Sequence, residues 1–189
     1  MAIDIAGWLE FKLTMEWLGV MNLRYILERD YTMFALLGRS HGIVSAIPLI
    51  DGRRGLPDDI CSEMREHLAE DFDIYKTGGT WFLWDDIARF VDSSFTLPLT
   101  TFVTEIYRKR PTGNEFKGTS SSYPSRTTPE QNKQLLTEGE TENEKYYYKL
   151  RTQQEQHKLE EGWIRAFEVA KDLSRRYGER RVRFSIYYE

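Results

Sequence analysis

Apolar and polar residues alternate at both ends of the chain. Over 3–13 the apolar residues are interleaved with Glu10 and Lys12, and over 182–188 they are interleaved with Arg183 and Ser185. A period of two places successive side chains on opposite faces of a sheet, so this pattern predicts a strand at each end. A strand at the end of a chain normally pairs within an existing sheet. We therefore expect the last strand to lie beside the first.

Shorter elements are expected between these strands. Asp30 is placed to cap a helix over 31–37, Asp58 or Asp59 to cap another over 59–70, and Asp85 to cap a helical turn through Phe90. A further short helix begins at 128 and ends at Gly139. We expect strands over 43–50 and 80–84, and either a turn or a strand over 15–22. A strand is also expected over 95–107, with a helix from about Leu99 as the alternative.

The longest predicted helix covers 141–177. Thr141 and Glu144 have the spacing of a capping box, and Gly178 follows the last turn. Its second half carries an apolar stripe at three- and four-residue steps, made of Leu159, Trp163, Phe167, Ala170, Leu173 and Tyr177. Its first half is polar and is expected to project from the body.

One stretch, 111–128, loses all periodicity and is dominated by Gly, Ser, Thr and Pro. We interpret it as a mobile loop or insertion, because it offers too little apolar surface to order itself. The predicted fold over 1–189 is a single α+β domain. It has a small, mostly antiparallel sheet that includes the N- and C-terminal strands, packed by the long C-terminal helix and by short helices.

Composition excludes several classes of protein. The net charge of −4 is unlike that of a duplex nucleic-acid binder, which needs a basic surface. The single cysteine forbids an internal disulfide, as is usual in a reducing cytosol. We expect no signal peptide and no contact with a membrane, because the chain has neither a leader pattern nor a long apolar run.

Catalytic and metal motifs fail on spacing. A calcium loop starting at Asp71 has Phe82 where a bidentate Glu is required, and Glu63 with His67 supplies only two metal ligands. Ser40 and His41 lack an assignable carboxylate that would orient the histidine. We therefore predict no catalytic residue, no metal and no cofactor, and favour a protein that is not an enzyme.

Some positions suit an anionic, planar ligand. Arg54 lies on a glycine-flanked loop, and Lys76 precedes consecutive glycines whose amides can form an anion-binding nest. Trp81 and Trp84 belong to a short aromatic strand, and aromatic rings can stack on bases. Ion pairing with nearby aspartates and simple core filling are the alternative interpretations.

Several segments together carry a resemblance. They are Arg29-Asp30-Tyr31 with Phe34, then Pro48, then Arg54-Gly55-Leu56-Pro57-Asp58-Asp59 with Ser62, then Thr80-Trp81, and Val182-Arg183-Phe184. In these segments the chain resembles a widespread set of uncharacterised phage and prophage proteins. The resemblance does not cover 111–145. That set has a His-Ser pair before the Trp, where this chain has Thr77-Gly78-Gly79-Thr80.

The resemblance implies a phage accessory protein in the host bacterial cytoplasm. By analogy alone with other small phage proteins of this build, we expect it to be of the anti-defence type. Our leading hypothesis is that it binds and sequesters a small anionic, nucleotide-like signalling molecule without catalysis. The ligand-binding residues would be Arg29, Arg54, Lys76, Trp81 and Trp84. One alternative is an inhibitor of a host protein that uses the long helix, and a second is a hydrolase of nucleotide messengers. The oligomeric state stays open, with a homo-oligomer as one of the alternatives.

Overall fold

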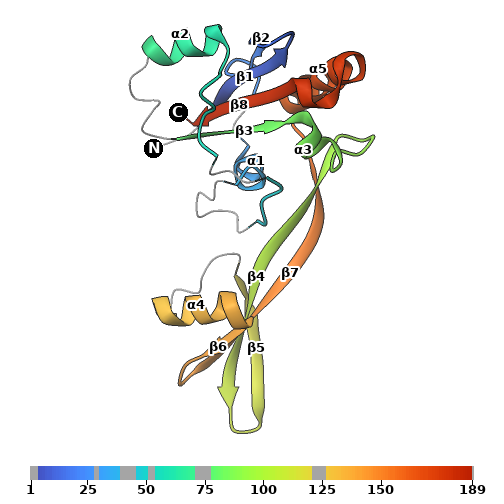
Figure 1. Cartoon of the computed structure of the whole chain (residues 1–189). Coiled ribbons are helices and arrows are strands. Elements are labelled where there is room, and N and C mark those ends of the chain that lie inside the picture. The colour runs from blue at the N-terminus through green and yellow to red at the C-terminus, as the bar shows by residue number, and fades with distance from the viewer. Residues whose placement is uncertain are drawn as a thin grey trace. The chain divides into compact units, whose positions relative to one another are not determined.

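The computed structural model describes residues 4–27, 30–38, 46–50, 54–70, 78–120 and 127–188. The chain divides into two compact units (Figure 1). Unit 1 consists of 1–39, 48–98 and 156–189, and unit 2 of 40–47 and 99–155. The prediction from the sequence is a single domain over 1–189. The α+β class is confirmed, since the described part contains helices and two antiparallel sheets.

Unit 1 is built on a four-stranded antiparallel sheet, sheet A. Its order is β2-β1-β8-β3, with β1 over Ile5–Lys12, β2 over Trp17–Asn22, β3 over Gly79–Leu83 and β8 over Val182–Tyr188. The two ends of the chain pair directly, with Leu9 opposite Phe184. This confirms the prediction that the last strand lies beside the first.

Helices cover both faces of sheet A. Phe184 meets Phe167 of α5 (Glu161–Tyr177), with ring centroids 5.5 Å apart. Side chains alternate between the two faces along a strand, so Tyr187, three residues after Phe184, points to the opposite face. There it packs with Met64 and Leu68 of α2 (Ser62–Glu70). Every residue of β8 is therefore buried, including the polar residues Arg183 and Ser185.

Two short helices complete unit 1. Asp30 caps α1 (Tyr31–Leu36) by accepting hydrogen bonds from the amides of Thr32 and Met33, as predicted. The helix α3 covers Trp84–Ala88. Its first turn is held by Asp86, which accepts from the amide of Leu83 at 3.1 Å, so the prediction that Asp85 caps this helix was wrong.

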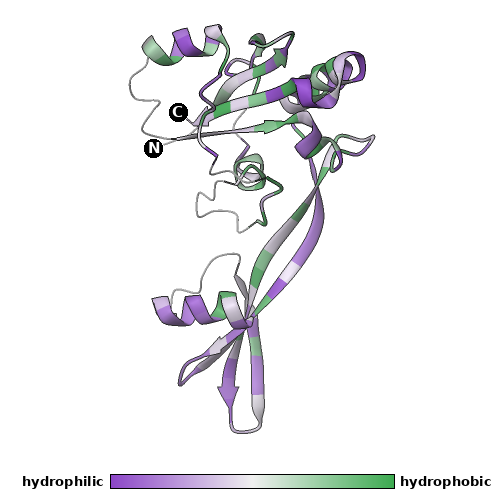
Figure 2. Ribbon diagram, in the orientation of Figure 1, coloured by the Kyte–Doolittle hydropathy of each residue, from purple (hydrophilic) through white to green (hydrophobic). Residues whose placement is uncertain are grey.

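Unit 2 contains the second antiparallel sheet, sheet B, with the order β5-β4-β7-β6. Its strands are β4 (Thr96–Arg110), β5 (Gly113–Ser120), β6 (Glu140–Glu142) and β7 (Tyr146–Lys158). The helix α4 covers Pro129–Glu138 and ends at Gly139 in the left-handed conformation, as predicted. The large buried side chains of unit 2 include Leu99, Leu135 and Tyr148, and Figure 2 shows mostly polar colouring along β6 and β7.

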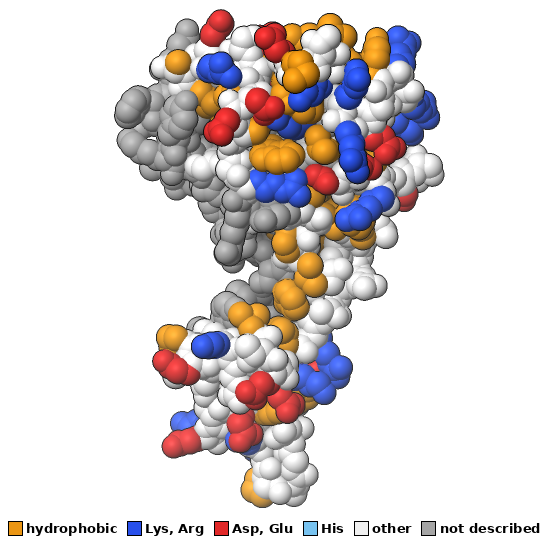
Figure 3. Space-filling view, viewed as in Figure 1, with side chains coloured by type: hydrophobic (Ala, Val, Ile, Leu, Met, Phe, Trp, Pro, Cys, Tyr) orange, Lys and Arg blue, Asp and Glu red, His pale blue; other side chains and the backbone are white. Residues whose placement is uncertain are grey.

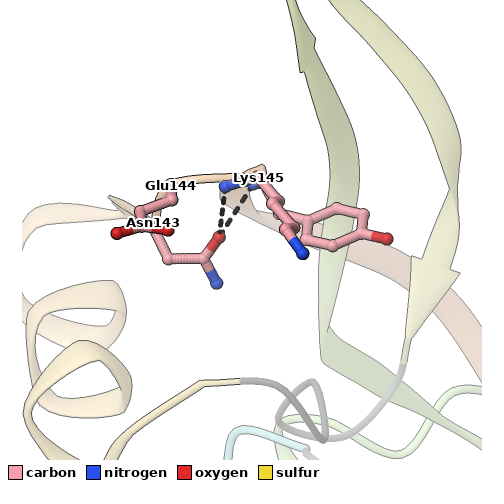
Figure 4. Close-up of a pocket in the computed structure, with 4 residues that line it drawn as sticks. Asn143, Glu144 and Lys145 are labelled. Carbon is pink, nitrogen blue, oxygen red and sulfur yellow. Dashed lines mark hydrogen bonds between the residues drawn. The ribbon is translucent and has the colours of Figure 1, made fainter.

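The prediction of one helix over 141–177 was wrong in its first half. The helix α5 begins at Glu161, and 146–158 form the strand β7 beside β4. Thr141 lies in β6 and donates a hydrogen bond to Gln134 at 2.8 Å instead of capping a helix. Asn143 instead closes the β6–β7 turn, accepting from the amides of Lys145 and Tyr146 (Figure 4).

The interpretation of 111–128 as a mobile loop was also wrong where the structure describes it. Within it, Gly113–Ser120 form β5, which pairs with β4 and places Phe116 opposite Tyr107. Residues 121–126 lie outside the described residues. The predicted strand at 43–50 falls partly outside them as well, and Ala46 forms an isolated bridge to Thr101. In the described part, no helix is long and apolar enough to cross a bilayer.

Candidate binding site on the sheet of unit 1

The α2-facing side of sheet A carries buried polar residues at neighbouring positions. Glu10 on β1 lies opposite Arg183 on β8, and Trp8 lies opposite Ser185. Glu10 and Ser185 are fully buried, and Arg183 is 3% exposed. Buried charges require partners, so the contacts of these groups decide what the cluster can do.

Each oxygen of the Glu10 carboxylate accepts hydrogen bonds from the protein. One oxygen accepts from Arg183 Nε at 2.7 Å and from the Ser185 hydroxyl at 2.5 Å. The other accepts from the amide of Cys61 at 2.6 Å. Glu10 therefore anchors the segment that enters α2 to the centre of the sheet.

The rest of the Arg183 guanidinium is bound by Asp59. Its two terminal nitrogens donate to the Asp59 carboxylate at 2.6 Å and to the Asp59 carbonyl at 3.0 Å, and its Cζ atom lies 4.0 Å from the centroid of the Trp17 ring. Burial alone would raise the pKa of Asp59, but the hydrogen bond and charge of Arg183 outweigh it and lower that pKa. All three nitrogens of Arg183 are thus engaged, and the cluster is a structural clamp.

Arg54 and Trp81 meet at the outer edge of the same face. Trp81 lies on β3 opposite Ser185, and the guanidinium of Arg54 lies 4.9 Å from its ring centroid. Arg54 also donates to the Asp86 carboxylate at 2.9 Å and to the Trp81 carbonyl at 3.4 Å. Both Arg54 and Asp86 are about one third exposed, with side-chain accessibilities of 29% and 32%.

The structure describes three of the five predicted ligand residues: Arg54, Trp81 and Trp84. The structure brings Arg54 and Trp81 together. Trp84 lies elsewhere, because it is only 5% exposed and packs edge-on against Phe167 in the core. Arg29 and Lys76 lie outside the described residues.

The surroundings of Arg54 are acidic. A cleft of about 470 Å³ is lined by Asp85, Asp86, Ala88, Arg89 and Glu179. A hydrogen bond between Asp85 and Glu179 raises the pKa of Glu179, as expected when two carboxylates share a site. Figure 3 shows acidic and basic side chains interspersed over this face of unit 1. The pair of Arg54 and Trp81 is therefore a local cationic feature on a mixed surface.

The described residues contain no group of three or more His, Cys, Asp or Glu side chains that could hold a metal ion. Burial raises the pKa of the Cys61 thiol to about 12, so it is not a nucleophile near neutral pH. His157 is bound to Asp30 at 2.9 Å and His67 to Arg24 at 3.2 Å, and both are parts of structural contacts.

The clamp around Arg183 was not predicted from the sequence. The sequence does contain a sign of it, because Glu10 and Arg183 carry opposite charges on two strands that were predicted to pair. The missing information was the register, which places them directly opposite each other.

No family model, no curated protein and no solved structure matches this chain. A functional assignment therefore depends on the geometry of its own residues.

Proposed function

We propose that the protein acts by binding rather than by catalysis, and that Arg54 and Trp81 receive a small planar anion such as a nucleotide. The observation that supports this proposal is the position of the Arg54 guanidinium over the Trp81 indole, with about one third of the Arg54 side chain exposed. A guanidinium can bind phosphate bidentately, and an indole can stack on a base. Both groups that a nucleotide needs are thus present at one place.

On binding, the phosphate of the ligand would replace the Asp86 carboxylate as the partner of Arg54. Asp86 holds Arg54 in the free protein, but it also accepts from the amide of Leu83. An incoming phosphate would take the guanidinium from Asp86, and Asp86 would keep its backbone partner. The exchange breaks the ion pair between Arg54 and Asp86. Because both groups are partly exposed, breaking this pair costs about 0–1 kcal/mol of free energy.

The test is calorimetric titration of the whole protein with ADP-ribose and with cyclic dinucleotides. We expect saturable binding of at least one of them, and a rise in melting temperature that grows with ligand excess. Arg54→Gln and Trp81→Leu should each weaken binding about tenfold or more, in line with the loss of one charge-assisted contact or one stacking contact. Arg175→Gln is the matched control, since Arg175 forms an exposed pair with Asp172 at 3.6 Å on α5.

A variant that should gain affinity distinguishes an effect on binding from a loss of folding. Asp86→Asn removes the charge that competes with the anion for Arg54, so it should strengthen anion binding while Arg54→Gln weakens it. Equal affinities in the wild type and both variants would contradict the proposed site. Recovery of unchanged ligand after denaturation would support sequestration, and recovery of cleaved ligand would support the hydrolase alternative.

A second candidate function is inhibition of a host protein, and one feature of unit 2 favours it. Tyr107 lies between Phe116 and Tyr147 across three strands of sheet B, with ring centroids 5.5 and 5.8 Å away. Phe116 is 55% exposed. Exposed aromatic rings are enriched in protein interfaces, so this row, and not a helix over 141–160, is the surface to test. Phe116→Ser should abolish capture of a host protein if it acts there, whereas Leu136→Ser, at a similarly exposed position on α4, should not.

A further inference from the structure

The strand β5 leaves one edge of sheet B open. Among the described strands it pairs with β4 alone, in a hairpin that places Lys109 opposite Asn114 and Tyr107 opposite Phe116. Most of β5 is exposed, and Phe116 has 55% of its surface accessible. An open strand edge carries unpaired backbone donors and acceptors, so it can pair with a further strand.

The pairing of β4 shows which backbone groups of β5 point to the open edge. The amide of Lys109 donates to the carbonyl of Lys145, just before β7, at 2.9 Å. Lys109 therefore directs its backbone groups to the β7 side of β4, away from β5. In an antiparallel ladder the residue opposite such a position also directs its backbone groups away from its partner. Asn114, and Phe116 two residues later, therefore have their N–H and C=O groups at the open edge.

Opposite charges flank Phe116 along β5. Lys117 donates to the Glu115 carboxylate at 2.5 Å, and Arg110 donates to it at 2.9 Å, so these three side chains share one face of the sheet. Phe116 lies on the other face, where its ring centroid is 5.5 Å from that of Tyr107. The side chains of Glu115 and Lys117 are 43% and 39% exposed, so both charges are accessible to a strand added at this edge.

We propose that β5 pairs antiparallel with β5 of a second copy of this chain, with the two copies of Phe116 opposite each other. A two-fold interface joins the same segment of both copies, so this register places Glu115 of each copy opposite Lys117 of the other. These two pairs are of the non-hydrogen-bonded kind, in which side chains approach most closely. Arg54 and Trp81 belong to unit 1, so the inference is independent of the site proposed there.

Charge selects both this register and this occupant. The smallest shift that keeps the backbone groups matched is two residues. Such a shift places Glu115 opposite Glu115 in one direction and Lys117 opposite Lys117 in the other. Like charges directly opposite destabilise a strand pair, whereas opposite charges stabilise it. A strand of unrelated sequence would leave both charges unmatched, and unmatched charges at a sheet edge oppose pairing.

The dimer would also extend the aromatic row of sheet B. Tyr107 lies between Phe116 and Tyr147 on one face, and a two-fold axis between antiparallel strands is perpendicular to the sheet. The rows of the two copies therefore lie on the same face and meet at Phe116. A single pair of strands makes a small interface of the weak, transient class. The dimer is accordingly expected at high micromolar concentration and should dissociate on dilution.

Sedimentation velocity of the whole protein, from low-micromolar to millimolar concentration, tests the proposal. We expect a monomer–dimer equilibrium for the wild type. Glu115→Lys and Lys117→Glu should each weaken the dimer about tenfold or more, because each places two like-charged pairs in one interface. The double variant Glu115→Lys/Lys117→Glu restores both opposite pairs and should dimerise like the wild type. A mixture of the two single variants should form a heterodimer that is tighter than either homodimer.

Introduced cysteines test the register. Phe116→Cys should form a disulfide between two copies on mild oxidation, because residues in a hydrogen-bonded antiparallel pair have Cα atoms about 5.5 Å apart, within the range of a disulfide. Asn114→Cys lies on the same edge, but it falls opposite Gly118 of the other copy and should not cross-link. The native Cys61 is buried, so it does not compete.

The matched control is Glu142→Lys. Glu142 pairs with Lys109 at 2.8 Å and lies on β6, away from the β5 edge, so this variant should dimerise like the wild type. A protein that stays monomeric at millimolar concentration would overturn the proposal. So would a dimer that neither charge variant weakens, or equal cross-linking by Asn114→Cys and Phe116→Cys.

Discussion

All three nitrogens of Arg183 make hydrogen bonds inside the protein, to Glu10 and to Asp59. A buried ion pair contributes little net stability by itself, but removing one partner leaves an uncompensated charge in the interior. Arg183 also joins the last strand, the first strand and the segment before α2. Its role is to fix the relative positions of these three elements.

Arg183→Met should therefore be strongly destabilising. We expect a loss of about 3–5 kcal/mol in the free energy of unfolding, because Glu10 keeps its buried charge without a cation. Urea unfolding followed by tryptophan fluorescence measures the change. The double variant Glu10→Gln/Arg183→Met should recover part of the loss, and an additive double variant would contradict the clamp.

Cys61 lies beside Glu10 and shares its environment. Burial is the main reason why the pKa of the thiol rises from 9.0 to about 12, and the negative charges of Glu10 and Glu63 add to it. The folded state therefore holds the thiol proton between these two pH values, where the unfolded chain releases it. The contribution of this thiol to stability is fully present below pH 9 and is lost as the pH rises toward 12.

The same pKa predicts an unreactive thiol. At pH 8 we expect the folded protein to react with a disulfide reagent at least about a hundredfold more slowly than the urea-unfolded chain, because the thiolate is scarce and the sulfur is buried. The chain has a single cysteine, so the chromophore that the disulfide reagent releases reports the reaction of Cys61 alone. Comparable rates in the folded and unfolded states would contradict the burial of Cys61.

At the scale of elements, α5 shows how close contact overrides helix propensity. Gly162 lies in its first turn, and an added Cβ would overlap the backbone carbonyl of Ile26. Elsewhere in a helix, Gly→Ala stabilises by about 1 kcal/mol. Here the neighbouring atoms are backbone and cannot rotate away, so the clash decides the sign.

Gly162→Ala should accordingly destabilise by about 1–3 kcal/mol, the usual cost of overpacking. Thermal or urea unfolding measures it. Glu168→Ala, at an exposed position of the same helix, is the control and should stay within about 0.5 kcal/mol of the wild type. A stabilised Gly162→Ala variant would show that 26–27 do not pack against this turn.

The strand β7 shows the reverse case, in which pairing overrides a plausible helix pattern. Gln153, Gln154 and Gln156 fit a helix or an exposed strand equally well. Hydrogen bonding to β4 and the turn closed by Asn143 place this stretch in sheet B. The sequence signal became decisive only past Leu159, where the apolar stripe begins.

At the scale of the whole molecule, the two units differ in how much they bury. In unit 1 the central strands β1 and β8 have helices on both sides. In unit 2 the strand β5 is an edge strand and is exposed along most of its length. Local opening is easiest where few apolar contacts must be broken.

Hydrogen exchange should separate the two units. We expect the paired amides of β1 and β8 to exchange only through global unfolding, and those of β5 to exchange at least about a hundredfold faster through local opening. Mass spectrometry of peptic fragments resolves the two regions, and α5 serves as an internal control that should follow β1. Equal protection of β5 and β8 would mean that the chain opens as one cooperative body.

The sequence by itself determined the elements whose signal is local. The terminal strands, the Asp30 cap and the end of the last helix at Gly178 follow from period and capping chemistry, which act over a few residues. The tertiary structure alone decided what depends on distant partners: the register that joins Glu10 to Arg183, the pairing that makes 146–158 a strand, and the burial that removes Trp84 from the surface while leaving Trp81 beside Arg54. The physical reason is that an isolated segment has its own backbone preferences. The energetic contribution of a charge or an aromatic ring depends instead on the groups that folding brings into contact with it.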